Sequence, residues 1–501
     1  KYGGFDTTMA PADNPNVRLT ATDPLAWDMN GDGVPDNWFA GSTPTLLRSS
    51  LSAAFSRINT IAGAAAASSA AVTSNRQTSS SEIIYAGYQP RDWTGSVRSC
   101  SPTQTAAQCN ATPTWDASHW LDSATNSVPA ANKLTPSTRK IFTSYRAPTT
   151  PFAFSTMRFQ WDSLNAAQQA TLDTDGNGAA RLEFVRGSRA SEGSLFRVRP
   201  SNLLGDIVNS GVTYLAGPGP ALIGPNFPGH ATYRNNTRTR PAVVYVGSND
   251  GMLHAFSGTT GRELFGYVPS AVLSKLVGYS AFNFRHEYMV DGTPMVGDFE
   301  KTGSTAASPN WGTLLVGGLG AGGRGYYALD ISSQSTFATD SEATLASALP
   351  IWEFTSAQDA DLGFTFNEPS ISPSTGAYRQ IAKFADATST TGAWRVAVGN
   401  GYGSTAGNAA LYLLDANTGA APTKLVAYTN TTGTAGENGL SSPTPVDTDR
   451  DGLMDTVYAG DLRGNLHKFQ FSRASGSDFV LARPAETGGA WRYLGVVYSS
   501  S

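Results

Sequence analysis

A short repeated pattern constrains the fold of this chain more than any other feature. A run of β-branched or aliphatic residues leads into a glycine-rich turn, and a second run ends in an aromatic residue or aspartate. The pattern recurs roughly every 60 to 80 residues, in segments 243–256, 313–330, 396–415 and 457–469. Repeats of this kind are typical of architectures in which each copy folds as one supersecondary unit. We therefore expect one β unit for each copy.

Each copy predicts two adjacent antiparallel strands. In the first copy, residues 253–256 alternate between two faces with a period of two, and the Asn-Asp-Gly sequence at 249–251 suits a tight turn with positive φ. Strand pairs at regular intervals are typical of β-propeller blades. We predict a mainly β fold with a modified β-propeller over residues 196–501. Residues 1–195 have a different texture, and we predict an irregular α+β region there.

The composition agrees with this fold and argues against several functions. The 501 residues include 52 Gly and 28 Pro, which favour turns over long helices. The formal net charge of −4 and the scattered Lys and Arg residues form no basic patch, so we expect no nucleic-acid partner. The longest apolar runs fall far below the roughly 20 residues that span a bilayer, so we expect no membrane insertion. The chain starts without an initiator Met or a signal-peptide pattern, and we expect it to be processed or partial.

The loop at 447–455 carries the strongest chemical signal. Carboxylates stand at positions 1, 3, 5 and 9 of this loop, as Asp447, Asp449, Asp451 and Asp455. Gly452 at position 6 permits a sharp turn, and the carbonyl of Leu453 is the expected ligand at position 7. Ca²⁺ prefers such a set of oxygen ligands, and carboxylates this close would repel one another without a cation. We predict a shortened calcium loop; a solvated acidic turn is the alternative.

Two further loops repeat the pattern less completely. In the loop at 28–36 the predicted calcium ligands are Asp28, Asn30, Asp32, Asp36 and the carbonyl of Val34. In the loop that begins at residue 173 they are Asp173, Asp175, Asn177 and the carbonyl of Ala179. Arg181 stands at position 9 of this third loop, so an Asx-rich turn after a helix is an open alternative. Because fewer carboxylates should bind more weakly, we expect affinity to fall from the 447 loop to the 28 loop to the 173 loop.

The only two cysteines bracket a polar segment of eight residues. We predict a local disulfide between Cys100 and Cys109, with free thiols on a loop as the alternative. A disulfide favours an oxidising compartment.

Signals of catalysis are weak. The glycine-rich sequence at 318–323 resembles a dinucleotide fingerprint by its letters, but it lies between two expected strands with no helix after it. The five histidines are dispersed, and His254 alternates within a strand, where a packing position is more common than a ligand. There is no Gly-x-Ser-x-Gly nucleophile motif. We predict no catalytic residues and no enzyme.

Several segments resemble known families. Residues 249–256 and 260–265 resemble the blade motif of quinoprotein-dehydrogenase-like propellers, as do residues 414–419, which implies a fold and not an activity. More specific sequences resemble the PilC/PilY family of type IV pilus tip proteins and adhesins, at 1–5, 196–200, 204–210, 286–294 and 458–465. Members of that family carry a secretion signal and a von Willebrand A-like domain upstream and more blades, so the resemblance implies a chain truncated at both ends.

The resemblance also implies a function. We expect a secreted calcium-binding pilus-tip protein that is exported through the periplasm to the outer cell surface, supports pilus assembly, retraction and twitching, and acts in adhesion and virulence. Its expected partners are minor pilins and host or abiotic surfaces. The alternative is a quinone- and calcium-dependent propeller dehydrogenase, but adjacent cysteines and a full ring of Trp-bearing motifs are missing. Some relatives carry Arg-Gly-Asp where this chain has Arg186-Gly187-Ser188; we expect a plain exposed turn there, without integrin recognition.

Overall fold

A computed structural model describes residues 67–72, 82–121, 126–148, 150, 152–200, 202–372, 376–421, 423–472 and 490–499. The contacts divide the chain into Lys1–Ala66 and Ala67–Ser501. The described residues all belong to the second unit, and the predicted calcium loop at 28–36 lies outside them. The second unit continues across residue 195, so the division into 1–195 and 196–501 stays a prediction from sequence texture.

The described strands form five antiparallel sheets, apart from one parallel pair in the second sheet. The first sheet contains β1 (Ala67–Val72), β2 (Ile83–Gln89), β3 (Thr94–Cys100) and β4 (Trp115–Asp116). The second contains, in spatial order, β6 (Phe154–Arg158), β5 (Ile141–Arg146), β10 (Glu263–Val268), β9 (Leu253–Ser257), β8 (Val243–Gly247) and β7 (Thr213–Leu215).

The other three sheets are four-stranded meanders in chain order. The third contains β11 (Met295–Glu300), β12 (Trp311–Gly318), β13 (Gly325–Asp330) and β14 (Pro350–Thr355). The fourth contains β15 (Ile381–Phe384), β16 (Ala393–Gly399), β17 (Ala409–Asp415) and β18 (Thr423–Tyr428). The fifth contains β19 (Thr444–Val446), β20 (Thr456–Gly460), β21 (Asn465–Ser472) and β22 (Ala490–Ser499).

Short helices lie in the connections. The α-helices are α2 (Ala106–Ala111), α3 (Ser118–Leu121), α4 (Ala166–Leu172), α5 (Gly178–Val185), α6 (His230–Asn236), α7 (Lys275–Ser280) and α8 (Glu342–Ala348). The 3-10 turns are η2 (Ala130–Asn132), η3 (Trp161–Ser163), η4 (Ser270–Val272), η5 (Gly320–Gly322) and η6 (Gln334–Thr336). Among the described residues, no helix has the length and apolar character needed to cross a bilayer.

The four repeated segments form the two middle strands of four consecutive meanders, which are β7 to β10 within the second sheet and the whole of the third, fourth and fifth sheets. These pairs are β8–β9, β12–β13, β16–β17 and β20–β21, and all are antiparallel. Gly251, in the turn between β8 and β9, has a φ of 93°. All eight residues of β12 are buried, because a middle strand between two neighbouring sheets is covered on both faces. The predicted mainly β, propeller-like fold is confirmed.

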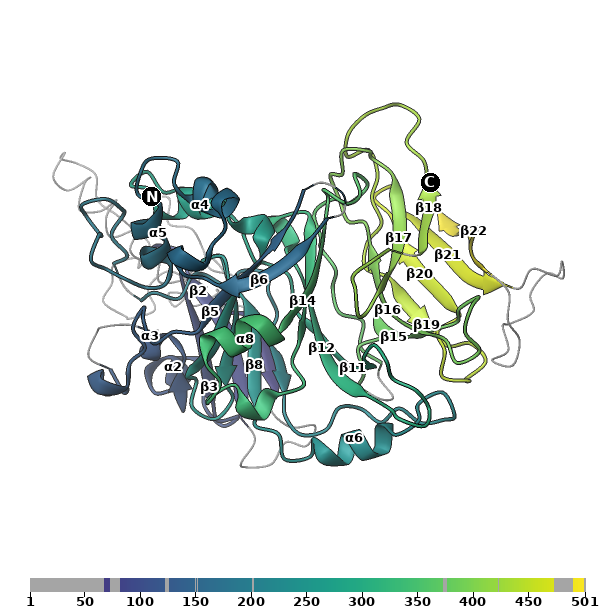
Figure 1. The fold of residues 1–501 in the computed structure, drawn as a ribbon, viewed down its shortest axis with the longest axis horizontal. Coiled ribbons are helices and arrows are strands. Elements are labelled where there is room, and N and C mark those ends of the chain that lie inside the picture. The colour runs from purple at the N-terminus through teal and green to yellow at the C-terminus, as the bar shows by residue number, and fades with distance from the viewer. Residues whose placement is uncertain are drawn as a thin grey trace, which may run out of the picture. The chain divides into compact units, whose positions relative to one another are not determined.

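The apolar core is divided into four clusters, one between each pair of consecutive sheets. Successive residues of a middle strand serve different clusters: Val244 packs toward the first sheet and Tyr245 toward the third. Likewise Leu315 packs toward the second sheet, and Leu314 toward the fourth. The sheets follow one another in chain order (Figure 1). Within the described part of the chain, no apolar cluster joins the first sheet to the fifth.

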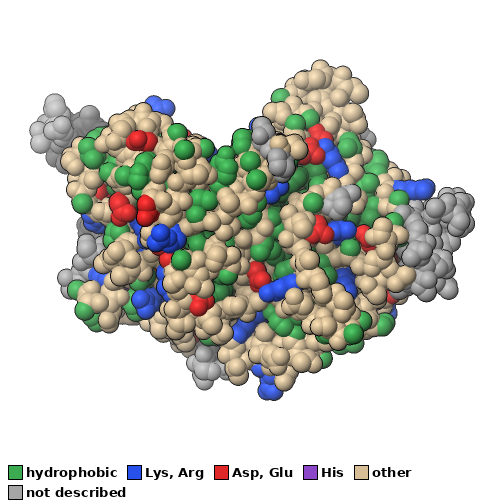
Figure 2. Space-filling view, in the orientation of Figure 1, with side chains coloured by type: hydrophobic (Ala, Val, Ile, Leu, Met, Phe, Trp, Pro, Cys, Tyr) green, Lys and Arg blue, Asp and Glu red, His purple; other side chains and the backbone are tan. Residues whose placement is uncertain are grey.

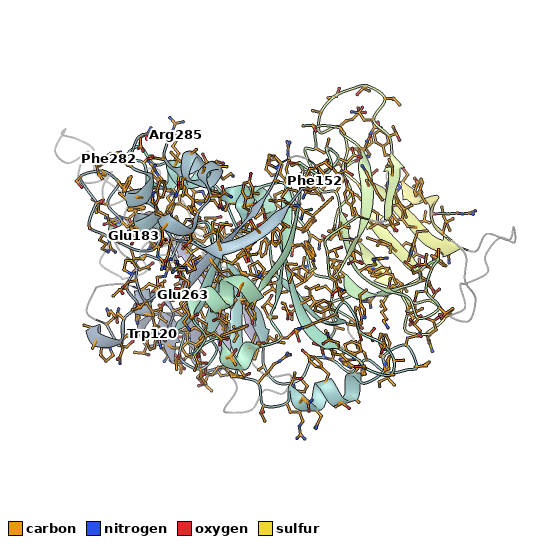
Figure 3. The ribbon with its side chains drawn as sticks, viewed as in Figure 1. Trp120, Phe152, Glu183, Glu263, Phe282 and Arg285 are labelled. Carbon is orange, nitrogen blue, oxygen red and sulfur yellow. A yellow bond between two sulfur atoms is a disulfide. The ribbon has the colours of Figure 1, made fainter. Side chains whose placement is uncertain are left out.

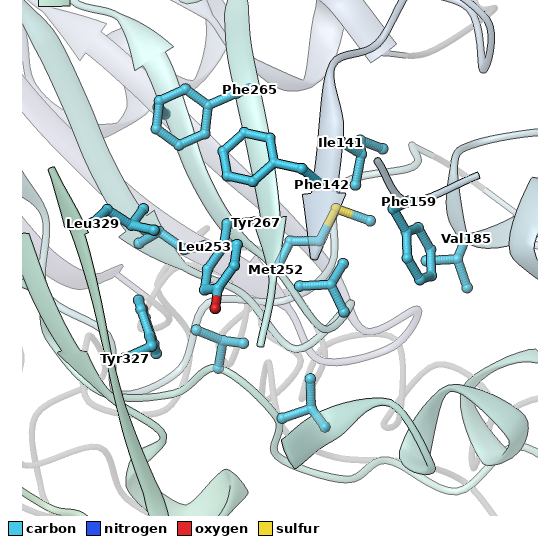
Figure 4. Close-up of a cluster of buried hydrophobic side chains, with 14 of the residues drawn as sticks. Ile141, Phe142, Phe159, Val185, Met252, Leu253, Phe265, Tyr267, Tyr327 and Leu329 are labelled. Atoms are coloured by element: carbon cyan, nitrogen blue, oxygen red, sulfur yellow. The ribbon is translucent and has the colours of Figure 1, made fainter. Parts of the chain in front are cut away.

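The second sheet receives two strands from the part of the chain before residue 195. β5 pairs with β10 in parallel, and β6 extends the sheet beyond it. The Phe142 ring of β5 lies 5.3 Å from that of Phe265 and 5.7 Å from that of Tyr267, as measured between ring centres (Figure 4). This segment is therefore an integral part of the apolar core.

The remaining surface features agree with a charge-balanced protein. On the face drawn in Figure 2, Lys and Arg side chains are spread among Asp and Glu side chains. Side chains fill the spaces between neighbouring sheets, and Glu263 lies within one of these packed regions (Figure 3).

Cys100, at the end of β3, forms a disulfide with Cys109 of α2, with their Cα atoms 5.6 Å apart.

Candidate metal centre

The acidic loop at 447–455 connects β19 to β20. Val446 and Thr456 are paired across the two strands, so the residues that follow and precede them, Asp447 and Asp455, meet at the base of the loop. One carboxylate oxygen each of Asp447, Asp449 and Asp455 can lie within 4.8 Å of the others. Asp449 is exposed, Asp447 is half-buried and Asp455 is buried. Oxygen atoms gathered in this way are suited to a hard cation such as Ca²⁺.

Hydrogen bonds to the backbone hold the loop in a tight turn. The Asp447 carboxylate accepts from the amides of Arg450 (2.7 Å) and Gly452 (2.9 Å). The Asp451 carboxylate accepts from the Leu453 amide at 2.8 Å. Arg450 and Gly452 have φ values of 66° and 93°. The chain itself therefore shapes the ring of carboxylates.

Within the described part of the chain, the carboxylates of this loop lack a basic partner. Among the described residues, no Lys, Arg or His forms an ion pair with its four carboxylates. Burial raises the pKa of Asp451 to about 6, with a further contribution from the neighbouring carboxylates. Burial also raises the pKa of Asp447, and Asp449 and Asp455 add to the effect. A bound cation would relieve this repulsion.

The geometry divides the predicted ligands into two groups. Asp447, Asp449 and Asp455 form the close cluster, and the Asp451 carboxylate is not part of it. Asp451 and the Leu453 carbonyl stay predicted ligands. The sequence did not single out Thr448. Its hydroxyl donates to both Asp455 oxygens, at 2.8 and 2.7 Å, and so orients that carboxylate. A hydroxyl directly after the first aspartate is the signal that could have indicated this role.

The loop is anchored to the fourth sheet and to the segment before α6. The Met454 amide donates to the Lys383 carbonyl at 2.8 Å. Asn226 Nδ2 donates to the Asp451 carbonyl at 3.0 Å, and a Cβ on Gly452 would lie only 2.7 Å from the Phe227 ring. A cavity of about 460 Å³ lies beside the loop, with walls that include Val296, Ile381, Val446, Asp447, Gly452 and Met454.

The loop that begins at Asp173 is arranged differently. It joins α4 to α5, and the Asp173 carboxylate accepts from the Gly178 amide at 2.7 Å. The buried Arg181 guanidinium forms an ion pair with Asp175 at 2.6 Å, and this hydrogen bond lowers the pKa of Asp175. Arg181 thus supplies positive charge where a cation would stand. The arrangement favours the alternative of a turn between two helices, and the predicted ligands Asn177 and Ala179 stay predictions.

The expectation of a plain exposed turn at 186–188 is wrong. Arg186 is only 1% exposed. Its guanidinium donates to Glu342 at 2.7 Å and to carbonyl oxygens of Phe159, Arg139 and Pro136. Arg186 therefore connects the segments that contain Pro136, Arg139 and Phe159 to α8 inside the protein. A receptor cannot reach it.

The sheets define the chain as a protein of the β-propeller class, with an acidic loop on its fifth described sheet. A family model described as the PilY1 beta-propeller domain matches residues 204–491. The chain belongs to this family.

Curated relatives match almost the whole chain. It is 34% identical to the type IV pilus biogenesis factor PilY1 of Pseudomonas aeruginosa strain UCBPP-PA14, over 93% of this chain and 38% of that protein. It is 32% identical to a PilY1 homolog of Xylella fastidiosa, over 94% of this chain and 34% of the homolog. The crystal structure of the P. aeruginosa PilY1 C-terminal domain aligns with 57% of this chain and 53% of that domain, at 33% identity and a TM-score of 0.41. The chain thus spans little more than a third of the curated relatives.

Proposed function

We propose that this chain is a non-catalytic, calcium-binding part of a type IV pilus biogenesis factor. One observation supports the assignment to pilus biogenesis: relatives that match 93% and 94% of the chain are named as a type IV pilus biogenesis factor and its homolog. The proposed action is support of pilus assembly and retraction, and so of twitching and virulence.

Calcium has a structural role in this proposal. Asp447, Asp449 and Asp455 would hold the ion, with Asp451 and the Leu453 carbonyl as further ligands. The ion would neutralise carboxylates that have no basic partner among the described residues, and it would stiffen the base of the β19–β20 hairpin. The 28–36 loop is a second proposed site, and the 173 loop is the weakest because Arg181 already pairs with Asp175.

The proposed location is the pilus tip or outer cell surface, after export through the periplasm. The Cys100–Cys109 disulfide is consistent with an oxidising compartment. Minor pilins are the proposed partners at the tip, and host or abiotic surfaces are the proposed targets of adhesion.

Gene replacement tests this function in the bacterium that carries the gene. We expect deletion to reduce surface pili, twitching and attachment, and the whole wild-type gene to restore them. Asp449→Asn removes one charge from the exposed side of the loop and keeps a hydrogen-bond acceptor. A gene with this substitution should restore pili, but the dependence of piliation on calcium should differ from that of the wild type. Glu287→Gln is the control for loss of an exposed carboxylate elsewhere. Normal piliation, twitching and adhesion in the deletion strain would refute the proposal.

A further inference from the structure

A cavity of about 380 Å³ lies where the second and third sheets meet. Its wall consists of Arg146, Pro148, Ser270, Ala271, Arg324, Thr355, Ser356 and Ala357. These residues come from the ends of β5 and β14, the start of η4 and the turn before β13. The eight residues, all in the described part of the chain, include no Asp or Glu. Phe152, in the same β5–β6 hairpin as Arg146, is labelled in Figure 3.

The Arg146 side chain, which lines this cavity, has no hydrogen-bond acceptor among the described residues. Its Nε is buried and unpartnered, and the guanidinium forms no ion pair with the described residues. Burial lowers the pKa of Arg146, an effect that nearby Glu353 partly offsets. Glu353 is already occupied, because its Oε1 accepts from Ser144 Oγ (2.6 Å), the Tyr267 hydroxyl (2.7 Å) and the Ser270 amide (2.8 Å). A half-buried guanidinium without an acceptor among the described residues favours binding of an acceptor from a ligand.

Arg324 provides a second, firmly placed guanidinium. Its Nη2 donates to the Gly403 carbonyl at 2.6 Å, and its central carbon lies 5.3 Å from the centre of the Phe364 ring. Its other N–H groups form no hydrogen bond with the described residues, and no acidic side chain there pairs with it. The Phe364 ring and the Gly403 carbonyl hold the Arg324 side chain in place. Because the side chain is already ordered, a ligand that binds it loses little free energy to side-chain ordering.

We propose that this cavity binds a small ligand carrying a carboxylate or phosphate group between Arg146 of the second sheet and Arg324 of the third. Guanidinium groups bind both kinds of oxyanion through paired N–H donors. The volume lies within the range of about 300–1,000 Å³ that is usual for small-ligand pockets. Because one ligand would contact two sheets, its binding would also stabilise their junction. The site is independent of the calcium loop and of any role in pili.

Calorimetric titration at low ionic strength tests the site with sodium phosphate and sodium succinate in separate arms. We expect saturable 1:1 binding of at least one probe, and the arm that binds identifies the oxyanion. Arg146→Gln and Arg324→Gln should each weaken binding at least tenfold. Arg285→Gln, which removes an exposed arginine outside the cavity (Figure 3), should leave it unchanged. Absence of saturable binding in both arms, or wild-type affinity in Arg146→Gln, would overturn the proposal.

A second measurement needs no variant and so does not depend on how the variants fold. Phenylglyoxal modifies accessible arginines, and peptide mass spectrometry reports the rate at each position. The bound probe should slow modification of Arg146 and Arg324 and leave Arg285 unaffected. Equal rates at Arg146 with and without either probe would contradict the proposed site.

Discussion

Buried charges of the second sheet form a connected set of contacts at the residue scale. Arg139 donates to both oxygens of Glu263, at 2.6 and 2.7 Å. The His254 ring lies 2.8 Å from Glu263 through Nδ1 and 3.1 Å from Asp250 through Nε2. The Gly205 amide donates to Asp250 at 3.0 Å. All four side chains are almost fully buried, so each charge depends on its neighbours.

This set predicts a loss of stability at alkaline pH. Burial favours neutral His254, but Asp250 and Glu263 outweigh it and raise the pKa of His254 to about 9. Stability from the charged ring is therefore fully present below the unfolded value near 6.5 and is lost as pH rises to about 9, by about 3 kcal/mol at most. Burial alone would raise the pKa of Glu263, but the Arg139 and His254 contacts lower it to about 2, so Glu263 titrates outside this window.

Urea unfolding between pH 6 and 9 measures the effect. The difference in unfolding midpoint between wild type and His254→Gln should be largest near pH 6 and should shrink toward pH 9. A difference that stays constant over this range would show that His254 carries no charge in the folded protein.

Sequence reasoning reached these residues only in part. The period of two placed His254 in a strand, and a packing position was the expected one. Its partner Glu263 belongs to the next strand, and the bulge in the β9–β10 register that brings them together cannot be read from single-sequence alternation. Arg181 was also predicted only in part. The sequence shows it at position 9 of the loop, but its ion pair with Asp175 depends on where helix α5 begins.

At the scale of elements, the β19–β20 hairpin depends on one glycine. Gly452 has a φ of 93°, and a side chain there would meet the Phe227 ring. We expect Gly452→Ala to cost about 1–2 kcal/mol for the positive φ, and about 1–3 kcal/mol more for the overpacking.

The matched control for this change is Gly433→Ala. Gly433 has a φ of 75°, but a Cβ there would meet no atom within 4 Å. Chemical unfolding of both variants should show a larger loss for Gly452→Ala. Equal losses would mean that the Phe227 contact does not constrain the loop.

The four repeated strand pairs were predictable because burial leaves nearly continuous apolar runs in strands such as β12 and β17. The first strands of two meanders, β7 and β19, were not predictable because they contain only three residues each. The outer strand β18 is only partly buried and so has a weak apolar pattern. The parallel pairing of β5 with β10 joins segments more than a hundred residues apart, and local patterns contain no information about it.

At the scale of the whole molecule, each described sheet shares its core with its neighbours. The loop at 447–455 follows the same principle, because it contacts the fourth sheet at Lys383 and the Asn226 segment as well as its own hairpin. A cation there would therefore stabilise more than a single turn. The carboxylate spacing predicted this loop, but its contacts with Asn226 and Phe227 depend on folding of a segment more than two hundred residues away.

The melting temperature of the whole protein with calcium and with a chelator tests the account most directly. Ligand at 100 times its Kd stabilises the folded state by about 2.7 kcal/mol, so calcium should raise the melting temperature of wild type and of Glu287→Gln by a few degrees. The rise should be clearly smaller in Asp449→Asn, because that variant loses one carboxylate of the cluster. Identical melting temperatures of the wild type in calcium and in chelator would contradict the claim that this propeller loop binds calcium.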